Sequence, residues 1–309
     1  MTTAILIPCY NEEKTIANVI NDFKNELPNA DIYVYDNNST DNTIKIAKDA
    51  GAIVRCEFKQ GKGNVVRSMF RDIDADCYIL VDGDDTYPAE AAREIEKLIL
   101  SKKADMVIGD RLSSTYFTEN KRPFHNVGNK LVRKFINLIF NSDIKDILTG
   151  YRGFNYDFVK SFPISSKEFE IETEMTVFAL NHNFLIKQIP VNYTDRTEGS
   201  VSKLNTYKDG YKVISLIFSL FRDTKPLFYF SLITLILLII AIVYFIPILI
   251  TFLNTGFVEK VPTLIIISMV IIISALIFLT GVILHVLKNQ HLQNFEHYLT
   301  IIRQNKKND

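Results

Sequence analysis

The chain has 309 residues, enough for one large domain or two modest ones, and its 35 Lys and Arg residues equal its 35 Asp and Glu residues. A dedicated nucleic-acid-binding protein usually carries a basic excess, so the zero formal net charge argues against that class. Cys9, Cys56 and Cys77 have neither metal-ligand spacing nor a pairing pattern, and we expect reduced thiols in a cytosolic domain. We expect no secretory signal, because no basic region precedes the apolar residues 5–7 and polar residues follow at once.

Short β-branched runs alternate with helical patterns from residue 1 to about residue 200. The expected strands cover residues 3–7, 32–35, 53–56, 78–81 and 106–108. The expected helices between them cover residues 13–26, 40–50, 64–73 and 89–101. This alternation predicts an α/β domain in which helices cover both faces of a mainly parallel sheet.

Polar clusters follow the first four expected strands, at residues 8–12, 36–39, 61–63 and 82–85. The carboxyl ends of parallel strands share one edge of a sheet, where such sheets bind ligands. We therefore expect a binding site for a polar ligand at this edge.

Asp82 and Asp84 flank Gly83 directly after the apolar residues 79–81. Two carboxylates this close repel each other, and a divalent cation removes that cost. Mg²⁺ or Mn²⁺ would be held by one or both carboxylates together with oxygens of a substrate diphosphate. A solvated acidic turn is the alternative, and the position directly after a strand favours the metal site.

Two other clusters have alternative interpretations. Lys62 lies between Gly61 and Gly63, which suits an anionic or ribose-bearing ligand but also an ordinary flexible turn. Asp36 could accept hydrogen bonds from a base or ribose hydroxyl, or cap the helix expected from residue 40. Further along, one of three alternating acids could contact a bound substrate, or all could form a solvated helix start; these are Glu170, Glu172 and Glu174.

Two long apolar stretches dominate the C-terminal third. Residues 227–253 contain no charged side chain, and residues 262–287 contain His285 as their only titratable group. Each is long enough to cross a hydrocarbon layer of about 30 Å, and a buried helix pair in a soluble protein is the alternative. The apolar residues within 206–226 recur at three- and four-residue spacing, which predicts an amphipathic helix on the membrane surface or one packed on the soluble domain.

Basic residues gather on both sides of the spans. They are Lys203, Lys208, Lys212, Arg222 and Lys225 before the first span and Lys288, Arg303, Lys306 and Lys307 after the second. The positive-inside rule predicts a plasma-membrane protein with both termini in the cytoplasm. The expected organisation is a cytoplasmic catalytic domain at 1–205, a juxtamembrane helix at 206–226, spans at 227–253 and 262–287, an extracytoplasmic loop at 254–261 and a cytoplasmic tail at 288–309.

The motifs at the sheet edge resemble those of glycosyltransferase family 2. They are Ile7, Pro8, Cys9, Tyr10, Asn11 and Glu12, the segment 36–41, Gly61, Lys62 and Gly63, and Asp82, Gly83 and Asp84. Residues 146–152, from Asp146 to Gly150, Tyr151 and Arg152, and Arg196 with residues 199–203 resemble the polyprenyl-phosphate group of that family. This group includes the dolichol-phosphate mannose synthases and the GtrB-type undecaprenyl-phosphate glucosyltransferases.

The resemblance implies a Rossmann-like GT-A fold, a nucleoside-diphosphate sugar donor, a divalent metal and inversion at the anomeric carbon. It implies that Pro8, Tyr10, Glu12, Asp36 and Lys62 line the nucleoside pocket and that Asp82 and Asp84 serve the metal and diphosphate. Its candidates for phosphate binding are Arg111 on the donor side and Arg152, Arg196, Ser202 and Lys203 on the acceptor side. Asp146 would be a general base or an orienting group, and the extra carboxylate of Asp85 leaves open which acids face the metal.

These inferences predict an inverting transferase that moves a hexose, glucose or N-acetylglucosamine first, from a UDP-sugar to undecaprenyl phosphate for cell-envelope glycan modification. A phosphate monoester is already largely dianionic at neutral pH, so its attack needs little help from a base, and arginines could neutralise charge instead. Use of GDP-mannose and a non-catalytic nucleotide-sugar-binding subunit are the alternatives, and homo-oligomers are compatible with either. The absence of tryptophan and the two spans argue against a processive polysaccharide synthase, and spans without charges argue against a transporter.

Overall fold

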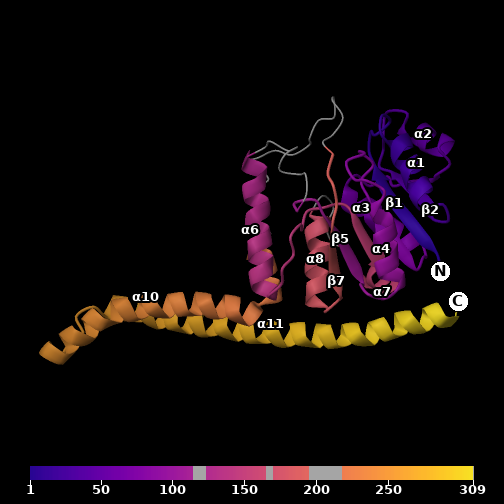
Figure 1. Cartoon of the computed structure of the whole chain (residues 1–309). Helices are drawn as coiled ribbons and strands as arrows, with labels where there is room; N and C mark the ends of the chain where they lie inside the picture. Colours follow the sequence, from indigo (N-terminus) through magenta and orange to yellow (C-terminus); the bar gives the residue numbers. More distant parts are fainter. Residues whose placement is uncertain (114–122, 165–169, 195–217, 309) are drawn as a thin grey trace. The chain divides into compact units, whose positions relative to one another are not determined.

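The computed structural model describes residues 1–113, 123–164, 170–194 and 218–308. The chain divides into two compact units, one formed by Met1–Gly210 together with Tyr298–Asp309 and the other by Tyr211–His297. The first unit contains an α/β sheet, and the second contains two long apolar helices (Figure 1).

Seven strands form one sheet in the order β3-β2-β1-β4-β6-β5-β7. Their bounds are β1 Thr3–Cys9, β2 Asp31–Asp36, β3 Ile53–Cys56, β4 Cys77–Leu80, β5 Met106–Asp110, β6 Arg152–Asn155 and β7 Ile186–Pro190. Only β6 runs antiparallel to its neighbours β4 and β5; the other pairings are parallel. The mainly parallel α/β sheet expected from the sequence is therefore confirmed, with a mixed region around β6.

Helices cover both faces of this sheet. Their bounds are α1 Ile16–Glu26, α2 Thr43–Asp49, α3 Lys62–Asp72, α4 Ala91–Leu100, α6 Pro123–Phe140, α7 Tyr156–Ser161 and α8 Ile171–Asn181. Helix α1 buries Ile16, Val19, Ile20 and Phe23, whose three- and four-residue spacing puts them on one face. That face packs in one core with the inward residues of β1, such as Ile5 and Ile7, and with α4.

The opposite face of the sheet is packed with aromatic rings. Phe154 of β6 stacks on Phe158 of α7 with ring centroids 4.8 Å apart, and Phe70 of α3 meets Phe154 edge-on at 5.6 Å. Phe178 of α8 meets Phe158 at 5.6 Å. Burying each such ring contributes roughly 1.5–3 kcal/mol, so these contacts hold α3, α7 and α8 against this face of the sheet.

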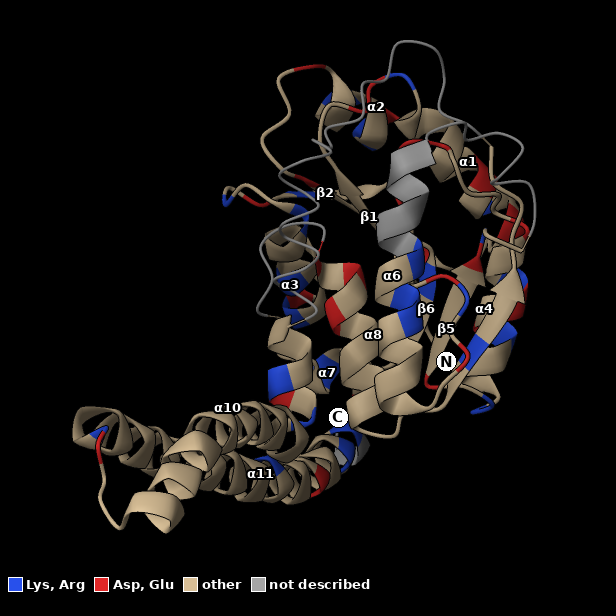
Figure 2. Cartoon of the chain, turned by 90° about the vertical axis from the view of Figure 1, so that its left-hand side faces the viewer, with Lys and Arg blue, Asp and Glu red and all other residues tan. Residues whose placement is uncertain are grey.

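The second unit is built from α10 Pro226–Thr255 and α11 Val261–Asn308, and α11 continues into the first unit from Tyr298 onward. The most apolar windows of the two helices have mean hydropathies of 3.1 and 2.8, so both are long and apolar enough to cross a membrane. Charged side chains are sparse along most of their length and gather at the connection between them and toward the C-terminus (Figure 2). Most of the juxtamembrane segment expected at 206–226 lies outside the described residues, and residues 218–224 are helical.

The end of α11 packs within the first unit. Arg303 Nε lies 2.6 Å from a carboxylate oxygen of Asp157, and Lys306 Nζ lies 2.7 Å from one of Asp76. The cytoplasmic tail expected at 288–309 is therefore helical as far as Asn308 and ends against the catalytic unit.

Candidate functional site

The loops that follow β1, β2 and β3 are joined by side-chain amides. Asn11, with a φ of 55°, accepts a hydrogen bond from the backbone N–H of Thr40 at 2.8 Å. Asn37 accepts one from the backbone N–H of Gly61 at 2.7 Å and donates to the carbonyl oxygens of Glu57 and Lys59. Three separate loops therefore form one connected surface at the carboxyl edge of the sheet.

Asp36 ends β2 on this surface and is 1% exposed. One of its carboxylate oxygens accepts a hydrogen bond from the backbone N–H of Ser39 at 2.9 Å, while the other is buried and has no hydrogen-bond partner among the residues that the structure describes. The capping role that Asp36 could have filled belongs to Asp41, which accepts from the backbone N–H of Thr43 at the start of α2. A buried carboxylate oxygen without a partner is costly, and a hydroxyl or N–H of a ligand would satisfy it.

Three other residues expected near a nucleoside lie at the end of β1 or in the loop that follows it. Pro8, Tyr10 and Glu12 are all half-buried. The backbone N–H of Glu12 donates to the hydroxyl of Thr43 at 2.9 Å, so this loop is fixed against the start of α2. The structure therefore brings these three residues to the same edge of the sheet as Asp36.

The acidic triplet directly follows β4, and its glycine is required by close packing. A Cβ at Gly83 would lie 2.8 Å from Cys9 Sγ, and the Gly83 carbonyl accepts a hydrogen bond from Thr15 Oγ1 at 2.7 Å. Asp84 is 7% exposed and accepts from the Thr86 hydroxyl at 2.7 Å, whereas the side chain of Asp82 is 28% exposed. The triplet is thus held rigidly, with the carboxylate of Asp82 the more accessible of the two.

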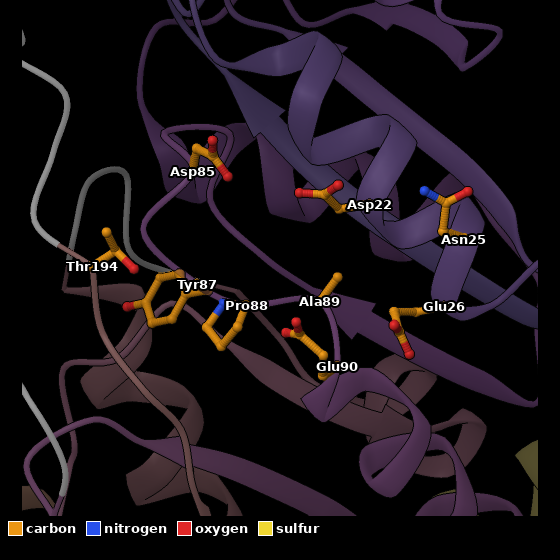
Figure 3. A pocket seen from close by; sticks show the side chains of 9 residues that line it. All are labelled: Asp22, Asn25, Glu26, Asp85, Tyr87, Pro88, Ala89, Glu90 and Thr194. Atoms are coloured by element: carbon orange, nitrogen blue, oxygen red, sulfur yellow. The ribbon is translucent and has the colours of Figure 1, made fainter.

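Asp85 belongs to a different cavity. It has a φ of 58° and lines an acidic pocket together with Asp22 and Glu26 of α1 and with Glu90 (Figure 3). Burial and the nearby Asp22 raise the pKa of Asp85 above its usual value. We therefore assign Asp82 and Asp84, rather than Asp85, to the site at the sheet edge.

Lys62 joins the triplet to helix α8. Its Nζ lies 2.6 Å from Asp82 Oδ1 and 2.6 Å from Glu172 Oε1. Burial of the ammonium works against its charge, but Asp82 and Glu172 outweigh this and raise the pKa of Lys62 above its usual value. The sequence suggested a nucleoside contact for Lys62, and the structure puts its ammonium on Asp82 of the acidic triplet. The solvated helix start considered for Glu172 is wrong, because this residue is 4% exposed.

The loop between α6 and β6 closes against the same triplet. A Cβ at Gly150 would lie 2.3 Å from Asp82 Oδ2, so only glycine leaves room for that carboxylate. The backbone N–H of Gly150 donates to the Tyr87 hydroxyl at 3.2 Å, which fixes the loop in this position. Segment 146–152 therefore lies beside the acidic triplet although about 65 residues separate the two in sequence.

Within this loop, Asp146 pairs with Arg111. Arg111 Nε lies 2.7 Å from Asp146 Oδ2, and Nη2 donates to the Leu148 carbonyl at 2.9 Å. The side chains of Arg111 and Asp146 are 12% and 2% exposed. The Arg111 guanidinium also lies 6.0 Å from the ring centre of Tyr193. The acid considered as a base or an orienting group is therefore bound to an arginine that the sequence did not pair with it.

Arg152 points into the protein. It is 0% exposed and donates to the carbonyl oxygens of Thr149 and Ile147 and to the hydroxyl of Thr176 on α8. Burial lowers the pKa of Arg152 to about 10, still well above neutral pH. The acceptor-phosphate contact and catalytic role expected for Arg152 do not fit this inward geometry; its guanidinium holds the loop on α8. The remaining acceptor candidates, Arg196, Ser202 and Lys203, lie outside the described residues.

A divalent cation fits the chemistry of this edge when it arrives with a diphosphate. Within the described ranges, no group of three or more His, Cys, Asp or Glu side chains is arranged to hold a metal ion. Mg²⁺ and Mn²⁺ sites in nucleotide enzymes commonly use one or two carboxylates and complete their coordination with phosphate oxygens. Asp82 and Asp84 provide such a pair, and Lys62 provides a cation beside it.

Comparisons with known proteins agree with this geometry. The family model for glycosyl transferase family 2 matches residues 4–162. Protein RfbJ from Shigella flexneri is 58% identical over 108 residues, covering 35% of this chain and 84% of that protein. Glycosyltransferase AglJ from Haloferax volcanii is 36% identical over 229 residues, 74% of each chain. A dolichyl-phosphate hexose transferase from the same organism is 25% identical over 207 residues, 67% of this chain and 88% of that one.

A solved structure shares the fold. Glucosyl-3-phosphoglycerate synthase from Mycobacterium tuberculosis, in complex with Mn²⁺, UDP and glucosyl-3-phosphoglycerate, aligns with a TM-score of 0.57. The alignment covers 71% of this chain and 78% of the synthase at 17% sequence identity. This likeness shows a common GT-A-type architecture.

Proposed function

The chain belongs to glycosyl transferase family 2, and from this premise we propose that it transfers a hexose from a UDP-sugar to a polyprenyl phosphate, with inversion at the anomeric carbon. The reaction would take place at the cytoplasmic face of a plasma membrane, with both termini in the cytoplasm. Undecaprenyl phosphate is the acceptor we expect, and the lipid-linked sugar would serve cell-envelope glycan modification.

One observation carries the donor side of this proposal. Asp82 and Asp84 lie on the same connected edge of the sheet as the buried, unpartnered oxygen of Asp36. The carboxylates of Asp82 and Asp84 suit a cation bound to a diphosphate, and the Asp36 oxygen suits the ribose or base of the same nucleotide. The related fold seen with Mn²⁺ and UDP supports UDP over GDP as the first donor to test.

The acceptor is proposed from two further observations. The chain carries two helices long and apolar enough to cross a membrane, which suits an acceptor with a long hydrocarbon tail. A relative that covers 67% of this chain is named for the dolichyl-phosphate acceptor class. Glucose and N-acetylglucosamine are the preferred sugars, and GDP-mannose is the alternative donor.

The chemistry needs charge neutralisation more than proton removal. The lipid phosphate is largely dianionic at neutral pH and can attack the anomeric carbon directly. A bound divalent cation would neutralise the diphosphate leaving group, with Asp82 and Asp84 as its protein ligands. Arg111 donates to the Leu148 carbonyl of the loop whose Gly150 packs against Asp82, and we assign to it the phosphate contact first expected of Arg152. Asp146 then orients Arg111 and takes no proton.

The direct test uses purified full-length protein in detergent with Mn²⁺ or Mg²⁺, undecaprenyl phosphate and separate samples of UDP-glucose, UDP-N-acetylglucosamine and GDP-mannose. Mass spectrometry of the lipid extract is expected to show one hexosyl phosphate lipid, and Asp84→Asn is expected to abolish it. A parallel sample with 3-phosphoglycerate tests a water-soluble acceptor. Sugar transfer to that acceptor and none to the lipid would contradict the proposal.

A further inference from the structure

Glu172 is a buried acid whose contact lies far away in the sequence. It sits in the first turn of α8, is 4% exposed, and its Oε1 lies 2.6 Å from the ammonium of Lys62, 110 residues away. The same ammonium lies 2.6 Å from Asp82 Oδ1. A single lysine at the start of α3 is therefore shared between the metal triplet and a second helix.

Both ends of this bridge are fixed by secondary structure. Glu172 is held by α8, whose N-terminal dipole favours a carboxylate in the first turn. Lys62 is the first residue of α3 and follows Gly61, whose φ of 123° is open to glycine alone among common residues. A buried carboxylate is costly unless it is paired, so Glu172 keeps the ammonium close at all times.

Asp82, in contrast, is the carboxylate for which the Lys62 ammonium and a metal ion would compete. Its Oδ1 contacts the Lys62 ammonium, and its Oδ2 faces Gly150 so closely that a Cβ there would lie 2.3 Å away. A metal ion that binds Asp82 must therefore displace or share the oxygen used by Lys62. With its side chain 28% exposed, Asp82 is open to such an exchange, whereas Glu172 is not.

We propose that Lys62 is a resident cation that neutralises Asp82 until the donor arrives, and that Glu172 is the positioning residue that keeps this ammonium in place. This inference rests on the proposed function, because its ligand is a nucleoside diphosphate with a divalent ion. When that complex binds, Asp82 would serve as a ligand of the metal, and the Lys62 ammonium would turn from Asp82 to the diphosphate while it stays on Glu172.

The exchange makes metal and nucleotide binding depend on each other. Without nucleotide, a metal ion must compete with the Lys62 ammonium for the Asp82 carboxylate, so the metal alone binds weakly. With nucleotide, the displaced ammonium gains a phosphate partner, and the two ligands stabilise each other's binding. A site that contained only the two aspartates would bind the metal alone more tightly and show weaker coupling.

The test measures two affinities on the full-length protein: Mn²⁺ alone by electron paramagnetic resonance, and UDP in saturating Mn²⁺ by calorimetry. Lys62→Met is expected to bind Mn²⁺ alone about tenfold more tightly and UDP with Mn²⁺ about tenfold more weakly. Lys62→Arg keeps the charge and is expected to bind Mn²⁺ alone as weakly as the wild type. Glu172→Gln is expected to weaken UDP binding about fivefold without strengthening binding of Mn²⁺ alone.

Glu170→Gln is the matched control, because half-exposed Glu170 directly precedes α8 and loses the same charge. It is expected to match the wild type in both affinities, and thermal unfolding checks that each variant is folded. If Lys62→Met fails to fold, the comparison of Lys62→Arg with Glu172→Gln still decides the question. Wild-type affinities in both Lys62→Met and Glu172→Gln would overturn this inference and leave the proposed function standing. A wild-type protein that binds no UDP would contradict the proposed function and this inference with it.

Discussion

Asp146 holds Arg111 by two oxygens, with Arg111 Nε 2.7 Å from Oδ2 and Nη2 3.5 Å from Oδ1. Asp146 lies in the loop whose Gly150 packs against Asp82, and Arg111 directly follows β5, so the arginine is fixed against the same loop that packs on the acidic triplet. A carboxylate bound in this way is poorly placed to accept a proton from a substrate. It is well placed to aim a guanidinium at a phosphate.

Asp146→Asn is expected to raise the KM for the lipid phosphate about tenfold, because the guanidinium loses its charged partner and its fixed direction. The shape of the pH–rate profile is expected to stay the same, since no base has been removed. Exposed Asp143 in the same loop provides the control substitution Asp143→Asn, which we expect to be silent. If Asp146 is a general base, Asp146→Asn would instead remove the rise of the rate with pH that ionisation of this carboxylate causes.

Arg152→Lys is expected to lower the free energy of unfolding by about 3 kcal/mol, because a lysine cannot reach two carbonyls and a hydroxyl in the protein interior. Thermal and chemical denaturation of the full-length protein in detergent would measure the loss. Arg133→Lys is the matched control, because Arg133 is half-exposed and donates to one backbone carbonyl, that of Lys145. Unchanged stability of Arg152→Lys together with a large rise in the KM for the lipid would restore the phosphate-clamp role.

Gly150→Ala is expected to weaken binding of UDP with Mn²⁺ at least about tenfold, because the new methyl group would push the Asp82 carboxylate out of place. Binding in the absence of the metal should change much less, since the ribose and base contacts lie elsewhere on the edge. Calorimetry with and without Mn²⁺ separates these effects. Equal losses in both titrations would point to general distortion of the site.

The raised pKa of Lys62 gives a pH prediction. A group whose pKa is higher in the folded state stabilises that state fully below its unfolded pKa, about 10.4 for lysine, and loses this contribution only as the pH rises through the folded pKa. The Lys62 charge should therefore persist between about pH 6 and about pH 9, and UDP binding with Mn²⁺ should show no titration of Lys62 there. A decline toward pH 9 that Lys62→Arg removes would show that the ammonium deprotonates in this range.

The first half of the fold follows closely from the sequence. Strands β1 to β5 coincide with apolar, β-branched runs. Polar residues follow several of these strands, and the parallel sheet brings them together at one edge, where such sheets bind ligands. Strand β6 has no such pattern, since it reads Arg, Gly, Phe and Asn and is held by tertiary contacts. Its Gly153 leaves room for Ile95 of α4, a contact that no local pattern could reveal.

Tertiary contacts also explain why Arg152 and Glu172 differ from what the sequence predicts for them. A motif identifies Arg152 as important but does not give the direction of its side chain, and burial decides its role. Alternating acids at a helix start resemble a solvated turn, and only the fold reveals that Glu172 meets Lys62. The one signal in the sequence was the apolar character of α8. A helix with so many apolar residues is mostly buried, so an acid such as Glu172 within it is expected to be buried and paired.

The central claim is that a divalent cation and a nucleoside diphosphate bind together at Asp82 and Asp84, and crystals soaked with Mn²⁺ and UDP test it most directly. We expect an anomalous manganese peak within coordination distance of an Asp82 or Asp84 oxygen and of both phosphates, with the ribose or base near Asp36. Ordered UDP without a manganese peak at these two aspartates, or UDP bound away from this edge of the sheet, would contradict it.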